Sequence, residues 1–289
     1  TPEELKKLYK SNGYSVLAYT DHEILNYFKE LSDDKFLVLC GYEAACYIED
    51  CGHGFEKCYH FNLISEDPEK ASYIPLHKQY DLNLINKTIQ KMKSAGYLIS
   101  YNHPAWSAQD SSDFIGLKGI TSMEIYNNTC EMRHNCGDAR SHYDNILKHG
   151  KKIFWIATDD NHNVDVNIKE WDSDSCGGWN MIKAAELSYS AVIKAYKNGE
   201  FYSSTGPEIR EYYIEDNILH ITCSAVKGIF LKSNNIGAVS KIISKNDDIT
   251  HAEFDINKLL KSTKGNSFVR VEMVDSQGKR AFTNPYFFK

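Results

Sequence analysis

The sequence predicts an α/β protein, built on a parallel sheet or barrel and followed by a small all-β sandwich. Two observations indicate this division. Up to about residue 205, apolar runs alternate with segments of helical spacing, which is typical of βαβ units. Beyond that point the apolar runs are short, alternate with polar residues and are separated by Asn, Gly and Asp turns. We therefore expect two domains, 1–205 and 206–289, with a boundary beside Gly206 and Pro207.

The first domain contains the expected strands and helices in alternating order. Expected strands are the apolar runs at 15–22, 35–47, 97–106, 121–128 and 152–162. Expected helices show apolar residues at helical spacing, and they lie at 1–10, 23–31, 80–96, 141–151 and 188–202. The segments 80–96 and 188–202 each contain a glycine near the end, which is a common helix stop.

Composition excludes several classes of protein. Hydrophobic residues make up 42% of the 289 residues, enough for a sizeable core. The apolar runs are too short to span a bilayer, and no signal-peptide pattern opens the chain. The net charge of -6 argues against a surface for duplex nucleic acid. The eight cysteines form no CxxC pair, so we expect reduced thiols in a cytoplasmic protein.

Polar residues with metal-binding side chains follow several of the expected strands. Each taken alone is most simply a helix cap or a turn residue. In a parallel barrel, however, the carboxyl ends of all strands open on one face. Imidazoles and carboxylates together suit Zn²⁺, Mn²⁺ or Fe²⁺. The sequence therefore predicts a metal site made of residues at strand ends, namely Asp21, His22, Glu43, His103, Asp160 and His162.

The same segments resemble the PHP (polymerase and histidinol phosphatase) superfamily. The resemblance rests on residues 1–22, on GYE (41–43), on SYNHP (100–104) and on ATDDNH (157–162). Residues 140–162 and 177–209 are similar to its bacterial metallohydrolase branch, which carries a C-terminal β domain. The resemblance implies a distorted (β/α)7 barrel, similar to a TIM barrel, with two or three divalent metal ions.

Matching the family motifs assigns a role to each ligand. The resemblance implies that His22 binds one ion, that Glu43 bridges two, and that Asp160 and His162 complete the cluster. It also implies that His60 and His103 bind the second ion, although the sequence around His60 alone indicates a half-buried strand residue. The family usually opens with a strand carrying an HxH motif. This sequence begins after that motif, so we expect a barrel without its first strand.

The resemblance further implies a metal-dependent phosphoesterase that hydrolyses a small phosphorylated molecule. We expect Arg140, or alternatively Arg133, to hold the phosphate, because a guanidinium can bind it in a bidentate manner. His142 is the expected general acid. Glu124 could orient a ligand, and Trp106 could line a pocket for an aryl group. Two alternatives stay open: hydrolysis of carboxylic or carbamate esters at the same site, and a ligand-binding module with impaired catalysis.

Overall fold

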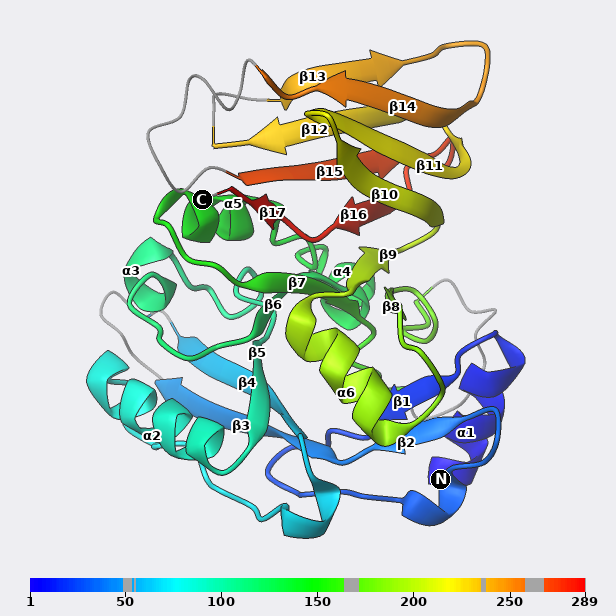
Figure 1. The fold of residues 1–289 in the computed structure, drawn as a ribbon. Helices are drawn as coiled ribbons and strands as arrows, with labels where there is room; N and C mark the ends of the chain where they lie inside the picture. Colours follow the sequence, from blue (N-terminus) through cyan, green and yellow to red (C-terminus); the bar gives the residue numbers. More distant parts are fainter. Residues whose placement is uncertain (49–53, 55, 164–171, 235–237, 258–267, 289) are drawn as a thin grey trace.

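The computed structural model describes residues 1–48, 54, 56–163, 172–234, 238–257 and 268–288. A central sheet of five strands positions most of the candidate ligands (Figure 1). In sheet order its strands are β3 (Gly41–Ile48), β4 (Lys57–Ser65), β5 (Tyr97–Tyr101), β6 (Ser122–Asn127) and β7 (Phe154–Thr158). The first three strands pair antiparallel, whereas β5, β6 and β7 pair parallel.

Four α-helices lie between β4 and β7 along the chain, one of them before β5 and three between the parallel strands β5, β6 and β7. They are α2 (Leu82–Ser94), α3 (Ser111–Phe114), α4 (Asn128–His134) and α5 (Arg140–Lys148). Ile85, Ile89 and Met92 on one side of α2 pack into the same core as Tyr143 and Ile146 of α5. Burial of these aliphatic and aromatic groups provides the main free energy that holds helices and sheet together.

The amino-terminal part forms a separate small layer. Helix α1 (Pro2–Ser11) begins with a capping box at Thr1 and packs against a two-stranded parallel sheet of β1 (Val16–Ala18) and β2 (Leu37–Leu39). Single β-bridges, His22 to Glu43 and Asn26 to Gly41, join this layer to the edge strand of the central sheet. The segment that carries His22 is therefore fixed beside Glu43.

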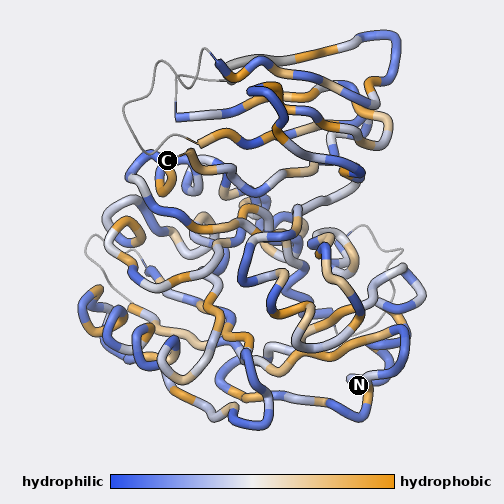
Figure 2. Tube along the Cα trace, viewed as in Figure 1, coloured by the Kyte–Doolittle hydropathy of each residue, from blue (hydrophilic) through white to orange (hydrophobic). Residues whose placement is uncertain are grey.

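The carboxyl-terminal part consists of two further sheets with a shared apolar core. Figure 2 shows their hydrophobic stretches running along the strands. The larger sheet contains β8 (Trp179–Ile182), β9 (Phe201–Ser204), β12 (Gly228–Ser233), β13 (Ala238–Ile243), β15 (Phe268–Val274), β16 (Arg280–Thr283) and β17 (Tyr286–Phe287). The smaller sheet contains β10 (Ile209–Glu215), β11 (Ile218–Val226) and β14 (Ile249–Asp255). All their pairings are antiparallel.

The expectation of a TIM-like (β/α)7 barrel is wrong. Strands occupy 37% and helices 23% of the structure, and the described residues contain only six α-helices, α1 to α5 and α6 (Tyr189–Asn198). A barrel of this type requires a helical crossover between successive parallel strands. Strands β3, β4 and β5 instead run antiparallel, and β1 and β2 form a sheet of their own. Several antiparallel sheets therefore replace the closed barrel.

The predicted boundary at residue 206 falls inside a continuous sheet. Strands β8 and β9 precede this point, yet β9 pairs with β16 near the carboxyl terminus. Phe268 and Phe282 also pack into the core of the central sheet. The boundary between two domains remains a prediction.

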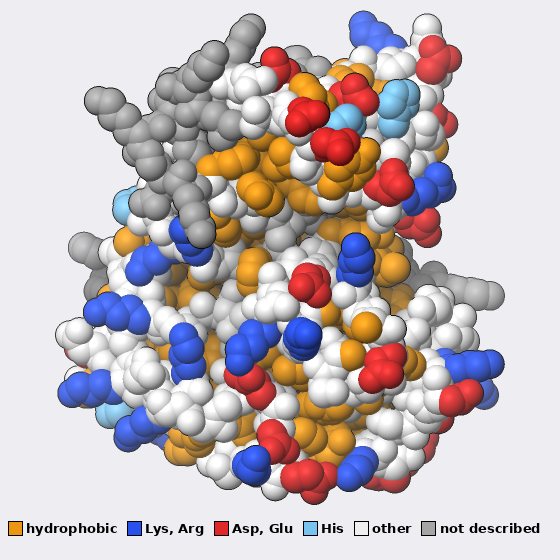
Figure 3. All heavy atoms as spheres, viewed as in Figure 1, with side chains coloured by type: hydrophobic (Ala, Val, Ile, Leu, Met, Phe, Trp, Pro, Cys, Tyr) orange, Lys and Arg blue, Asp and Glu red, His pale blue; other side chains and the backbone are white. Residues whose placement is uncertain are grey.

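Two observations concern the surface and the thiols. Within the described part of the chain, the helices are too short and too polar to cross a membrane. Lys and Arg side chains lie among Asp and Glu on the face seen in Figure 3. Cys51 lies outside the described residues, and the other seven cysteines are free thiols.

Candidate metal centre

The structure brings six of the seven predicted metal ligands together, whereas the Asp21 carboxylate accepts a hydrogen bond from the Asn26 side-chain amide. His22 follows β1, Glu43 lies on β3 and His60 lies on β4. The other three extend from the carboxyl ends of parallel strands: His103 follows β5, and Asp160 and His162 follow β7. The residues come from distant parts of the sequence, so they meet only because the chain folds in this way.

Glu43 is the centre of the cluster. Its Oε1 lies 2.9 Å from His60 Nδ1 and 3.5 Å from His103 Nε2. Its Oε2 lies 3.6 Å from His22 Nδ1. Ligand atoms of His22, Glu43 and His60 all lie within 4.8 Å of one another, a spacing suited to one divalent cation. The two carboxylate oxygens therefore face different imidazoles.

Asp160 and His162 extend the cluster on the other side. Asp160 Oδ2 lies 3.9 Å from His103 Nε2, and Asp160 Oδ1 lies 3.6 Å from His162 Nδ1. The ring centroids of His162 and His22 are 5.9 Å apart. The six side chains therefore form a continuous group around a shared space.

The imidazoles and carboxylates perturb one another strongly. Burial acts to raise the pKa of Glu43, but hydrogen bonds and charge from His103 and His60 outweigh it and hold that pKa well below its usual value. Burial acts to lower the pKa of His60, but Cys58 and Glu43 outweigh it and raise that pKa to about 11. The two shifts have opposite directions because the Glu43 carboxylate and the His60 imidazole stabilise each other's charged forms.

The Glu124 side chain lies beside the cluster and forms hydrogen bonds that orient its ligands. This fully buried carboxylate accepts hydrogen bonds from the His103 backbone N–H (2.8 Å) and the Thr158 hydroxyl (2.7 Å). The amide nitrogen of Asn127 donates to Glu124 and also to Asp160, at 3.0 Å in each case. Burial raises the pKa of Glu124 to about 7. Glu124 and Asn127 thus orient two of the ligands without belonging to the cluster.

The backbone at two ligands is strained. His103 has φ 25° and Asp160 has φ 51°, which is a conformation that residues other than glycine rarely adopt. The Glu124 and Asn127 contacts hold both positions. Strain of this kind concentrates at functional sites, where the surrounding structure maintains it.

Besides Ser107, whose hydroxyl lies 3.1 Å from His103 Nδ1, three residues in contact with the ligand side chains were not predicted from the sequence. Tyr47 Oη lies 2.7 Å from His60 Nε2, and the Asn102 amide donates to Glu43 Oε1 at 2.8 Å. Asn127 is the third. The spacing of Glu43 and Tyr47 offered a signal, because residues four apart on one strand point to the same side of the sheet.

Arg140 and His142 lie away from the metal cluster. Arg140 pairs with Asp138 at 2.5 Å and with Glu272 at 3.6 Å. His142 Nε2 lies 3.1 Å from the Gln109 carbonyl oxygen, and its ring is 5.6 Å from that of Phe114. Both residues lie away from the cluster because they belong to α5, and this helix packs between the central sheet and the carboxyl-terminal strands.

Arg133, the alternative phosphate ligand, has a connection to the cluster. Its guanidinium lies 3.0 Å from Asp174 Oδ2, and the same oxygen accepts a hydrogen bond from the His162 backbone N–H at 2.9 Å. The Arg133 side chain is 39% exposed, whereas Asp174 is fully buried. The buried Asp174 carboxylate therefore links the accessible Arg133 guanidinium to the backbone N–H of His162, a candidate ligand.

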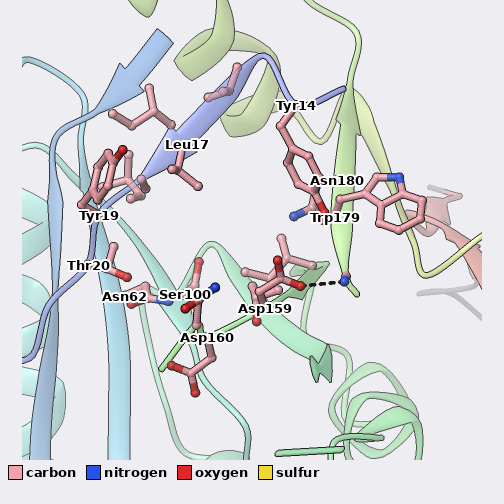
Figure 4. A pocket seen from close by; sticks show the side chains of 18 of the residues that line it. Tyr14, Leu17, Tyr19, Thr20, Asn62, Ser100, Asp159, Asp160, Trp179 and Asn180 are labelled. Carbon is pink, nitrogen blue, oxygen red and sulfur yellow. Dashed lines mark hydrogen bonds between the residues drawn. The ribbon is translucent and has the colours of Figure 1, made fainter. Parts of the chain in front are cut away.

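A cavity of about 430 Å³ reaches the cluster from the interior (Figure 4). Leu17 and Tyr19 border one side of it, and Asn62, Ser100 and Asp160 border the other. Its lining contains the carboxylates of Asp21, Glu43, Asp159 and Asp160 and, among the residues that the structure describes, no Lys or Arg. The cavity is thus apolar with an acidic end.

The donor set of the cluster fits a divalent metal ion. Four imidazoles and two carboxylates are the ligand types that Zn²⁺, Mn²⁺ and Fe²⁺ accept, and Glu43 and His103 are buried where an unpaired charge would be costly. Comparison with family models, curated proteins and solved structures finds no match for this chain. The resemblance to the PHP superfamily therefore remains a prediction.

Proposed function

We propose that the chain is a metal-dependent phosphoesterase that acts on a small phosphorylated molecule. The observation that supports this most directly is the convergence of His22, Glu43, His60, His103, Asp160 and His162 on one space. Such a group has little structural value of its own, because burying several titratable side chains together costs free energy.

The ligands divide naturally around Glu43. Its Oε1 faces His60 and His103, and its Oε2 faces His22, so the carboxylate can serve two cations at once. Asp160 faces His103 and His162 in the same manner. We infer that these residues hold two or three ions of Zn²⁺, Mn²⁺ or Fe²⁺. When bound, such ions offset phosphoryl charge and lower the pKa of water.

Arg133 is the residue that we propose for holding the phosphate, in place of Arg140. Its contact with Asp174 uses one terminal nitrogen and fixes the guanidinium near His162. The remaining N–H groups can donate to phosphate oxygens, and Arg binds them in a geometry that Lys cannot match.

Metal binding provides the first test. Calorimetric titration of the metal-free protein with Mn²⁺ and with Zn²⁺ should give tight binding. The His103→Ala and Glu43→Gln variants should each bind at least about tenfold more weakly. His149→Ala, which replaces an exposed histidine at the end of α5, is the matched control and should bind like the original protein. Unchanged binding in both site variants would show that the ligand assignment is wrong.

Activity distinguishes the reactions open to such a site. The metal-loaded protein should hydrolyse phosphate monoesters faster than the matching carboxylic esters, and the Glu43→Gln variant should lose this activity. Faster hydrolysis of carboxylic esters would replace the proposal by an esterase. Metal binding without hydrolysis of either class would indicate a ligand-binding module.

A further inference from the structure

Two exposed aromatic side chains lie at the outer rim of the metal cluster. Trp106 is 38% exposed and Tyr47 is 56% exposed. Their rings lie 6.0 Å and 5.2 Å from the ring of His60, and the Tyr47 hydroxyl is within hydrogen-bonding distance of His60 Nε2. Large apolar rings beside a polar cluster are surfaces on which another ring can pack.

The position of Trp106 is fixed by the turn that follows His103. The Ser107 N–H donates to the His103 carbonyl at 3.0 Å, and the Gln109 N–H donates to the Pro104 carbonyl at 3.1 Å. The Trp106 ring also meets the His103 ring edge to face, with centroids 5.0 Å apart. An exposed ring held in this way can bind a ligand with little loss of its own conformational freedom.

Helix α4, which contacts this rim through His134, also carries a cationic side chain. The ring of His134 is 6.1 Å from that of Trp106, and its neighbour on α4 is the anchored Arg133. The interior cavity reaches the same cluster, but carboxylates line its polar end and its described lining contains no Lys or Arg. A phosphate anion is therefore better stabilised at the rim than in the cavity.

We propose that the substrate is an aryl phosphate monoester whose planar aromatic group packs on Trp106 and Tyr47 while Arg133 holds its phosphate. This inference rests on the proposed function and adds the class of leaving group. In the reaction, a water oxygen forms a bond to phosphorus and the bond from phosphorus to the aryl oxygen breaks. That bond's electron pair stays on the aryl oxygen, which takes up a proton to give the phenol and inorganic phosphate.

The test compares two probes that cannot be hydrolysed. Phenylphosphonate should bind the Mn²⁺-loaded protein more tightly than ethylphosphonate, measured by calorimetry. Trp106→Ala should weaken phenylphosphonate binding at least about fivefold and leave ethylphosphonate binding within about twofold. Trp106→Phe should restore most of the difference in affinity between the two probes. This result would show that binding requires an aromatic ring at this position, and that the loss in Trp106→Ala does not come from a disturbed fold. Tyr213→Ala, which removes a half-exposed ring on β10, is the matched control.

The outcomes separate this inference from the proposed function. Equal weakening of both probes by Trp106→Ala would overturn it, because the ring would then act only through the fold. Weakening of phenylphosphonate by Trp179→Ala, on the cavity wall, but not by Trp106→Ala would place the aryl group in the cavity and also overturn it. Selective, Trp106-dependent binding of phenylphosphonate without hydrolysis of phenyl phosphate would support the aryl site and contradict the phosphoesterase.

Discussion

At the scale of single residues, Glu43 explains how one carboxylate organises the candidate site. It is 3% exposed, and its charge is stabilised by three imidazoles and by the Asn102 amide. A buried carboxylate without such partners would be protonated. The low pKa of Glu43 therefore keeps it charged and ready to bind a cation at neutral pH.

The Glu124→Gln variant tests whether a residue that orients the ligands contributes to metal affinity. Glu124→Gln keeps the size of the side chain but cannot accept hydrogen bonds from the His103 N–H, the Thr158 hydroxyl and Asn127 all at once. We expect affinity for Mn²⁺ to fall roughly tenfold in calorimetric titration while the protein stays folded. Glu69→Gln, which replaces an exposed carboxylate that pairs with Lys29, should leave the affinity for Mn²⁺ unchanged. Identical affinities for both variants would rule out the orienting role.

The sequence pointed to the ligands better than to their surroundings. His22, His103, Asp160 and His162 follow apolar runs and Glu43 lies within one, so the sequence could single them out as polar residues beside strands. His60 required the family resemblance. Tyr47, Asn102 and Asn127 are ordinary strand and turn residues by sequence, and only tertiary folding places them against the ligands. Arg140 has the same local signal as Arg133, and only the packing of α5 separates the two.

At the scale of elements, the periodicity of apolar residues identified helices and strands that bury one face against the core. Helices α2 and α6 and strand β7 lie inside the predicted segments, and Gly96 and Gly199, which follow the two helices, have φ 85° and 74°. The predicted helix at 23–31 is wrong, because only 29–31 form a 3₁₀ turn. The Glu23 and Asn26 N–H groups donate instead to the Glu43 and Gly41 carbonyls of β3, a long-range pairing that no local pattern reveals.

A buried hydrogen bond joins helix α1 to Asp159, which follows β7. The Tyr9 hydroxyl donates to Asp159 Oδ2 at 2.8 Å, and Asp159 also accepts the backbone N–H groups of Cys176, Gly177 and Gly178. Tyr9→Phe removes one partner of a buried carboxylate, so the free energy of unfolding in urea should fall by about 1.5–3 kcal/mol. Hydrogen exchange in α1 should accelerate most.

The control for this change is Tyr213→Phe, which alters a half-exposed tyrosine on β10. It should shift the free energy of unfolding by less than about 0.5 kcal/mol. If Tyr9→Phe proves equally harmless, the contact between Tyr9 and Asp159 does not hold α1 in place.

At the scale of the whole molecule, buried charge connects the carboxyl-terminal sheets to the central one. Arg270 on β15 is fully buried and pairs with Glu272 on the same strand and with Asp144 on α5. Its guanidinium also lies 4.4 Å from the centroid of the Trp155 ring on β7. Neither the pairing of β9 with β16 nor this contact leaves a local trace in the sequence.

Arg270→Met tests whether the two parts are one cooperative unit. The substitution keeps an apolar side chain against Trp155 but leaves Glu272 and Asp144 without their common partner. Removing one member of a buried ion pair typically lowers the free energy of unfolding by about 3–5 kcal/mol. If Arg270 couples the parts, intrinsic Trp fluorescence and far-ultraviolet circular dichroism should follow one transition in the original protein and two in the variant. Adding Glu272→Met and Asp144→Met should recover much of the lost stability, because no charge is then left unpaired by the change. A small loss with a single transition would show that apolar packing, and not Arg270, joins the sheets.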